Sequence, residues 1–221
     1  MWDTIVSGGV LMVPLAACSV LAVWVIVDRA FHLRTASVME PEIVGMIDSL
    51  EEPGDIPLAR SICERHPGPF AAIVRVALDH RDRPREELRE LIEDQGRQEV
   101  ARLERGLGLL ETVAGIAPLL GHLGTVFGMI QVFDVVSQQG VGQAQSLSGG
   151  IAQALITTAA GLSIGIPALV AYNYFTGKAE RLVLDMEAQT NRLVQKILRF
   201  QRDEPEDVGI ESQLRAGRRE R

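Results

Sequence analysis

Two long apolar segments of this chain carry the side chains whose types and spacing could support chemistry. His122 and Thr125 lie in the first segment, and Thr158 lies in the second. A threonine hydroxyl both donates and accepts hydrogen bonds, and a histidine exchanges a proton near neutral pH. Small residues recur around each hydroxyl at steps of three and four, which places them together on one helix face. Such faces are typical either of close helix packing or of a polar pathway through an apolar region.

The small residues themselves favour close packing of two helices. Gly124 and Gly128 form a small-xxx-small pair in the first segment, and Gly161 and Gly165 form another in the second. This spacing lets helix backbones approach each other in lipid. We therefore predict packing contacts at Gly121, Gly124, Gly128, Gly161 and Gly165, and we place Thr157 and Gln153 with Thr125, Thr158 and His122 as candidate pathway residues.

Each polar residue also has a structural explanation. A threonine hydroxyl can bond to a carbonyl of its own helix, and a buried histidine can be satisfied by a neighbouring carbonyl. Asp134 lies at the end of the first segment, so neither segment holds a carboxylate at its centre. If protons move through these helices, we expect the titratable group to come from another chain.

The positions of the charges identify the elements that must hold these residues. The chain has 221 residues, of which 22 are basic and 29 acidic, and its mean hydropathy of +0.13 resembles that of a soluble domain. However, the windows 4–27, 112–133 and 135–177 contain no Asp, Glu, Lys or Arg. Uncharged apolar stretches of about 18 residues or more indicate membrane-spanning helices. The last window divides at a polar, Gly-rich connector, which predicts three spans, at 5–27, 112–133 and 151–175.

Arginine and lysine positions predict the topology. Residues 28–111 contain 12 Arg, and 178–221 contain 8 Arg and 2 Lys, whereas 1–4 and 134–150 contain none. Since basic loops remain in the cytoplasm, we expect a periplasmic N-terminus at 1–4, a cytoplasmic loop at 28–111, a periplasmic connector at 134–150 and a cytoplasmic C-terminal helix and tail at 176–221. Mixed charge without a basic, aromatic face makes nucleic acid an unsuitable partner, while the basic end of the tail suits anionic lipid.

The cytoplasmic parts show helical periodicity. Breaks are expected at His66–Pro67–Gly68–Pro69 and at Pro84. Apolar stripes then continue into the second span through Leu103 and Leu107, and out of the third through Leu182 and Met186. The predicted fold is therefore an all-α membrane protein, with three transmembrane helices of which two extend into a cytoplasmic helical bundle.

Other classes of protein are disfavoured. Leu15–Ala16–Ala17–Cys18 resembles a lipoprotein processing box, but no Lys or Arg precedes it and the apolar run continues to Val27, which favours an uncleaved span. Cys18 and Cys63 form no metal-binding pattern. No hydrolase, phosphate-binding or dinucleotide-binding motif occurs, so we expect no enzyme activity, no metal and no cofactor.

Two motifs make the sequence recognisable. The segments Ala117–Ile130 (APLLGHLGTVFGMI) and Gly150–Asn173 (GIAQALITTAAGLSIGIPALVAYN) closely resemble the MotA/TolQ/ExbB proton-channel family, and the ExbB/TolQ branch fits best. The similarity extends to the three spans, the long first loop and the overall length. The loop and the tail resemble the family in general character and not in specific motifs.

The resemblance implies a function and partners. A five-fold ring of this subunit would surround two copies of a single-span partner, ExbD or TolR, in the bacterial inner membrane. The partner's membrane aspartate would carry protons, and the family's pore threonines fall on Thr125 and Thr158. The complex would use the proton motive force to drive a TonB-like or TolA-like protein, and through it outer-membrane transport or envelope processes.

Two departures and two alternatives accompany the resemblance. Several family members have glutamate where this chain has Gln153, and the position of His122 is usually apolar. A MotA-like motility stator subunit would share the pore but would have four spans and a larger cytoplasmic domain. A non-conducting membrane scaffold would share the small-residue packing and would need no aligned hydroxyls. Neither the energised cargo nor the choice between ExbB and TolQ follows from the residues.

Overall fold

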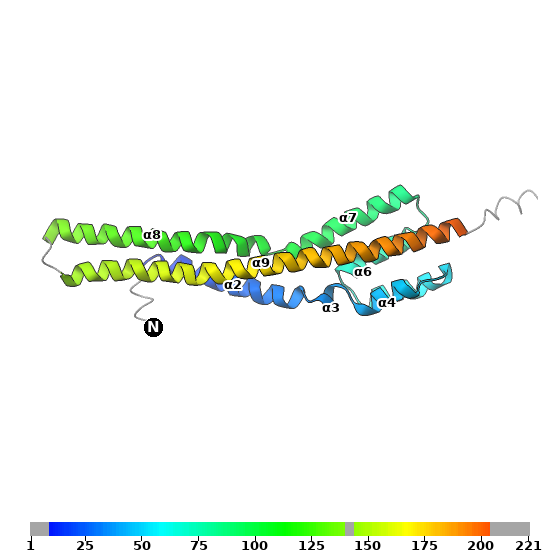
Figure 1. Cartoon of the computed structure of the whole chain (residues 1–221), viewed down its shortest axis with the longest axis horizontal. Helices are drawn as coiled ribbons and strands as arrows, with labels where there is room; N and C mark the ends of the chain where they lie inside the picture. Colours follow the sequence, from blue (N-terminus) through cyan, green and yellow to red (C-terminus); the bar gives the residue numbers. More distant parts are fainter. Residues whose placement is uncertain (1–8, 140–143, 204–221) are drawn as a thin grey trace, which may run out of the picture. The chain divides into compact units, whose positions relative to one another are not determined.

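A computed structural model describes residues 9–139 and 144–203 of the chain (Figure 1). Within these ranges the chain is helical and contains no strand, which confirms the all-α prediction. Three helical stretches among the described residues are long and apolar enough to cross a membrane, which is the number of spans that the sequence predicts. The expected segment 1–4, the first residues of the span 5–27, the centre of the connector 134–150 and the end of the tail 176–221 lie outside the described residues.

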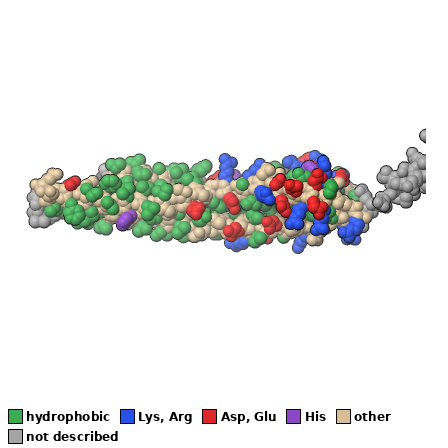
Figure 2. Space-filling model, turned by 90° about the horizontal axis from the view of Figure 1, so that it is seen from above, with side chains coloured by type: hydrophobic (Ala, Val, Ile, Leu, Met, Phe, Trp, Pro, Cys, Tyr) green, Lys and Arg blue, Asp and Glu red, His purple; other side chains and the backbone are tan. Residues whose placement is uncertain are grey.

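The elements follow one another as α2 (Met12–His32), α3 (Thr35–Val38), α4 (Pro41–Ser49), the short 3-10 helix η1 (Pro53–Asp55), α5 (Ile56–Arg65), α6 (Pro69–Asp79), α7 (Arg85–Glu104), α8 (Leu107–Gln139) and α9 (Ala144–Asp203). They form two compact units. The span unit combines the chain up to Arg34 with Arg102–Arg181, and the loop unit combines Thr35–Ala101 with the chain from Leu182. Hydrophobic side chains cover the span unit, and charged side chains gather over the loop unit (Figure 2).

In the span unit, α2 packs on α8 through a narrow stripe. Leu15, Ala22, Val25 and Arg29 are its buried residues. Most of its other apolar side chains are exposed, including Trp24 at 63%. An apolar helix with a single buried stripe is suited to lipid on its remaining surface.

The second span does not continue unbroken into α7, in contrast to the expected continuous helix. α7 ends at Glu104 and α8 begins at Leu107. Gly106 between them has φ of 83°, a left-handed conformation that favours glycine. Arg29 of α2 reaches the end of α7, where its Nη1 donates to the carbonyl oxygens of Arg102 and Leu103 at 3.4 and 3.3 Å. The guanidinium thus adds a charged donor at the C-terminal turn of the helix, where a cation is favourable.

The loop unit contains more helices than the proline pattern alone indicated. α5 and α6 lie on either side of the expected break at Pro67, and α7 starts directly after Pro84. Pro41 and Pro53 start two further short elements, because proline fits the first turn of a helix. Their buried residues form a core that includes Ile43, Ile47, Phe70, Val74, Leu78, Leu88, Leu193 and Ile197.

The last part of α9 holds this core together through backbone contacts. Lys196 Nζ donates to the carbonyl oxygens of Ile47 and Asp48, each at 2.7 Å. These carbonyls lie in the final turn of α4, where a cation is favourable. Gln201 donates to the carbonyl oxygens of Arg81 and Arg83, which precede α7.

Replacing Lys196 by methionine is expected to loosen α4. The change leaves two carbonyls without a charged donor, which costs about 1–3 kcal/mol. The amides of α4 should therefore exchange with deuterium about 5- to 100-fold faster, as measured by mass spectrometry on the full chain. Arg192→Met is the matched control, because Arg192 meets Asp48 only at 4.0 Å and is 62% exposed. Equal exchange in the Lys196→Met variant and the wild type would contradict the prediction.

Cys63 is buried in α5, and its thiol is expected to be inert. Burial is the main cause that raises the pKa of this thiol to about 11. Since the thiolate is the reactive form, alkylation at pH 8 should be about a hundredfold slower than for a free cysteine with an ordinary pKa. Iodoacetamide labelling of a Cys18→Ala variant, with and without denaturant, measures this. Equal rates in both conditions would show that Cys63 is accessible.

Candidate functional site

α8 and α9 run antiparallel and side by side, with glycines along their contact (Figure 1). All five glycines for which packing was predicted are buried. A Cβ on Gly161 would lie 2.5 Å from the carbonyl oxygen of Ala117 and 2.9 Å from the Cα of Gly121. A Cβ on Gly128 would lie 2.7 Å from the carbonyl oxygen of Gly150. The neighbours are backbone atoms that cannot rotate away, so only glycine allows this separation of the helices.

The three candidate threonines occupy different places at this contact. Thr157 is only 1% exposed and fills the space opposite Gly124. Its hydroxyl donates within its own helix, to the carbonyl oxygens of Gln153 and Ala154. Thr158 donates across the contact to the carbonyl oxygen of Gly121 at 3.1 Å. Thr125 donates to the carbonyl oxygen of His122, in its own helix, at 2.5 Å.

Helix geometry places Thr125, Thr158 and His122 on one flank of the pair. Each follows a buried residue of its helix by one position: Gly124, Thr157 and Gly121 respectively. Successive residues are about 100° apart around the helix axis. In two antiparallel helices that face each other, the flanks reached by this turn lie on the same side. His122 is exposed there, and the two threonines are half-buried.

Gln153 is separated from this group. It precedes the buried Ala154 and therefore lies on the opposite flank of α9. Its side-chain amide lies over Gly9, just before α2, where a Cβ on Gly9 would overlap it. Gly9 also has φ of 73°, which favours glycine. Thus Gln153 contacts the beginning of the first helix, whereas the two flank threonines do not share that contact.

The flank of Thr125 and Thr158 can accept hydrogen bonds without rearrangement. Each hydroxyl has given its proton to a backbone carbonyl, so its lone pairs remain available. A neutral carboxylic acid could donate to them directly. A charged carboxylate would require each hydroxyl to turn its proton away from the carbonyl. The flank therefore offers two different interactions to the two protonation states of a passing acid.

Titratable groups are scarce around this flank. Residues 112–133 and 148–177 contain His122 and no acidic, lysine or arginine side chain. No group of three or more His, Cys, Asp or Glu side chains suited to a metal ion occurs among the described residues. These two stretches therefore offer no carboxylate of their own beside the flank.

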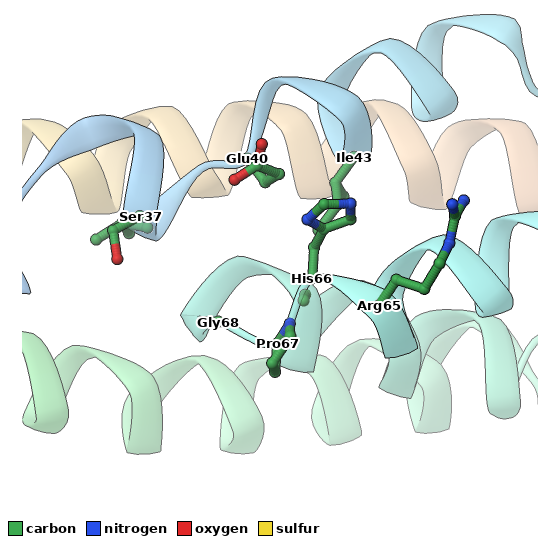
Figure 3. A pocket seen from close by; sticks show the side chains of 9 residues that line it. Ser37, Glu40, Ile43, Arg65, His66, Pro67 and Gly68 are labelled. Atoms are coloured by element: carbon green, nitrogen blue, oxygen red, sulfur yellow. The ribbon is translucent and has the colours of Figure 1, made fainter.

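A cavity of about 190 Å³ lies in the loop unit, lined by residues of α4 and of the corner between α5 and α6 (Figure 3). Figure 3 shows His66, from the corner between α5 and α6, pointing toward Ile43 of α4. His66 Nε2 lies 2.7 Å from the Glu42 carboxylate, and Arg65 Nη2 lies 3.4 Å from it. Glu42 therefore contacts both basic side chains. This pairing joins α4 to the α5–α6 corner, and the side chain of Glu40 also lines the cavity.

Sequence reasoning did not anticipate two buried charged residues. Glu99 is 1% exposed within the apolar stripe of α7, where it accepts a hydrogen bond from Gln95 at 2.7 Å. Arg29 is 8% exposed at the end of α2. Its position two residues beyond the charge-free window concealed its role, whereas the spacing of Leu88, Ile92, Glu99 and Leu103 could have identified Glu99.

Comparisons with known proteins find a family model and named relatives that match this chain. The family described as the MotA/TolQ/ExbB proton channel family matches residues 65–188. The chain is 36% identical over 176 residues to a biopolymer transport protein, ExbB-like 1, of Synechocystis, covering 77% of this chain and 68% of the relative. It is 29% identical to ExbB-like 3 of the same organism, covering 91% and 96%. Over 86 residues it is 38% identical to the Tol-Pal system protein TolQ of Pseudomonas aeruginosa, covering 39% and 37%.

Proposed function

The chain belongs to the MotA/TolQ/ExbB proton channel family, and we propose that it is the channel-wall subunit of an ExbB–ExbD-like or TolQ–TolR-like inner-membrane complex. This complex uses the proton motive force to energise outer-membrane transport or envelope processes. Five copies surround two copies of a single-span partner, which transmits the work to a TonB-like or TolA-like protein. Relatives named ExbB and TolQ support this assignment.

The proposed topology follows the charges. Asp134 is the only charged residue of the connector 134–150, whereas every lysine and arginine lies in 28–111 or 178–221. Because basic segments stay in the cytoplasm, the N-terminus and the connector are periplasmic. The loop unit and the C-terminus are then cytoplasmic.

The pairing of Thr125 and Thr158 on one flank of a glycine-packed helix pair carries the proposal. That flank lines the pore, and the partner's membrane aspartate moves along it. The neutral acid donates to the threonine oxygens and can also cross apolar surface. The charged form is costly in lipid, so it stays where the hydroxyls can turn toward it. Five subunits cannot treat two carboxylates alike, which favours stepwise rotation.

Thr157 and Gln153 have different roles in this proposal. Thr157 is enclosed by the α8–α9 contact, opposite Gly124, and serves packing. Gln153 fastens the third span to the beginning of the first, at Gly9. Any protonation role that a glutamate has at this position in other family members is therefore absent here.

Reconstitution tests the channel function. The full chain is placed in liposomes that hold a pH-sensitive dye, with or without its single-span partner. An imposed proton gradient should be dissipated when both proteins are present. Flux with a partner whose membrane aspartate is replaced by asparagine should fall to the level of empty liposomes. A non-conducting scaffold would show no flux in any of these preparations.

His122 is expected to modulate proton flux. It lies on the same flank as Thr125 but is exposed, and its ring nitrogens can form hydrogen bonds with a passing group. His122→Leu should lower flux several-fold at pH 6–7. Unchanged flux across this pH range would remove His122 from the pathway.

A further inference from the structure

We propose that the turn between α7 and α8 is a joint with two states, and that Arg29 of α2 is the latch that holds it in one of them. In the interrupted state, which the structure shows, Arg105 and Gly106 are not helical. In the continuous state the same residues are helical, and α7 and α8 form one helix. The joint lies within the span unit, and the inference does not depend on the proposed proton pathway.

The sequence around the joint is compatible with a continuous helix. No proline occurs in residues 85–117, and only two residues separate the end of α7 from the start of α8. Leu103, Leu107 and Leu110 are buried and follow one another at steps of four and three. These steps would keep the three leucines on one face of an uninterrupted helix. Closing the interruption would therefore preserve their apolar stripe.

The interrupted state depends on the backbone of one glycine. Gly106 has φ of 83°, which residues with a side chain rarely adopt. Among the described residues, the nearest atom to an added Cβ would be Val25 Cγ1 at 3.6 Å, an ordinary van der Waals contact. The space beside Gly106 thus accommodates a methyl group. An alanine at this position would oppose only the left-handed conformation.

Arg29 binds the acceptors that a continuous helix needs. In such a helix, the carbonyl oxygens of Arg102 and Leu103 would accept from the N–H groups four residues later. In the structure Arg29 Nη1 donates to these two oxygens, at 3.4 and 3.3 Å. The N–H of Leu107, at the start of α8, consequently has no partner within its own helix. The latch and the continuous helix therefore compete for the same carbonyl oxygens.

Asp28 orients the guanidinium for this contact. Its Oδ2 accepts from Arg29 Nε at 2.9 Å and from Arg29 Nη2 at 2.5 Å, which leaves Nη1 for the carbonyl oxygens. Its Oδ1 lies 3.2 Å from His32 Nδ1. Val25 and Arg29 are buried and four positions apart, so one face of α2 packs beside Gly106 and carries the latch. A displacement of α2 would withdraw the donor, so the state of the joint depends on the position of the first span.

Hydrogen exchange at Leu107–Leu109 distinguishes the two states, because these amides donate to carbonyl oxygens four residues earlier only in the continuous helix. Gly106→Ala opposes the left-handed conformation and favours a helical one. Exchange of the three amides, measured by mass spectrometry on the full chain in nanodiscs, should therefore slow at least about tenfold. Gly108→Ala is the matched control, since Gly108 is already helical and no atom lies within 4 Å of an added Cβ. It should leave exchange nearly unchanged after correction for intrinsic rates.

Arg29→Met tests the latch itself. Without the charged donor, the carbonyl oxygens become available to the helix, and exchange of the same amides should slow at least about fivefold. If Arg29 only supported the interrupted turn, its loss would make these amides exchange faster. Amides beyond Leu110 in α8, followed in the same digest, show that the helix pair remains folded. Unchanged or faster exchange at Leu107–Leu109 in the folded Arg29→Met variant would overturn the proposal, as would the same result for Gly106→Ala.

Discussion

Replacing Gly161 by alanine should separate α8 from α9 and lower the apparent melting temperature of the chain in detergent by about 2–10 °C. The added Cβ would lie 2.5 Å from the carbonyl oxygen of Ala117 and 2.9 Å from the Cα of Gly121. Both atoms belong to the backbone, so one helix must move. This movement also lengthens the hydrogen bond from Thr158 to Gly121, which is now 3.1 Å.

Gly115→Ala is the matched control for this prediction. Gly115 lies in the same helix pair, but no atom lies within 4 Å of an added Cβ. Alanine there removes the conformational cost of glycine in a helix, about 0.5–1 kcal/mol. The melting temperature should therefore stay constant or rise slightly. A shift of the same sign and size for both variants would show that the α8–α9 contact is not limited by Gly161.

The spans and their close contact could be predicted because they depend on local composition. A long apolar window without charges indicates a membrane-spanning helix. Glycines repeated every four residues allow the backbones of two helices to approach closely. Gly124 and Gly161 therefore lie where the pattern indicated, buried at the α8–α9 contact.

The positions of the hydroxyls required more than periodicity. Thr157 and Thr158 are adjacent, and a rotation of α9 by one residue step, about 100°, would put Thr158 where Thr157 lies. The spacing of three residues predicts that Thr158 shares a helix face with Gly161. In the structure it is Thr157 that is buried at the α8–α9 contact, opposite Gly124. The hydrogen bond from Thr158 to Gly121 connects residues 37 positions apart, which no local pattern indicates.

The break between α7 and α8 was missed for a similar reason. Gly96, Gly106 and Gly108 all lie in this part of the chain, yet of the three only Gly106 takes a positive φ, and the other two are helical. At the break, Arg29 of α2 donates to the carbonyl oxygens at the end of α7. This tertiary contact stabilises the helix end and is not visible in the local sequence.

The pore assignment depends on the hydroxyls of Thr125 and Thr158, and removing both should reduce proton flux about 10- to 100-fold. Valine has the shape of threonine but no hydroxyl group, so it cannot donate a hydrogen bond to a charged carboxylate. The loss of such a hydrogen bond costs about 1–3 kcal/mol, and each 1.36 kcal/mol changes a rate tenfold. The partner's aspartate would then be held less well in its charged form, and its stepwise movement would slow.

Thr112→Val is the appropriate control for this double variant. Thr112 also donates to a carbonyl of α8, that of Gly108 at 2.7 Å, but it is exposed on another face of the helix. Its substitution removes a comparable hydroxyl without touching the flank. Flux should remain at the wild-type level, and the melting temperatures of all variants should be recorded to exclude unfolding.

The most direct test of the channel is therefore proton flux into liposomes that contain the chain and its single-span partner, compared among wild type, Thr112→Val and the Thr125→Val, Thr158→Val double variant. The account predicts full flux for the first two and a loss of at least about tenfold for the third. Wild-type flux in a correctly folded double variant would contradict the assignment of this flank to the proton pathway.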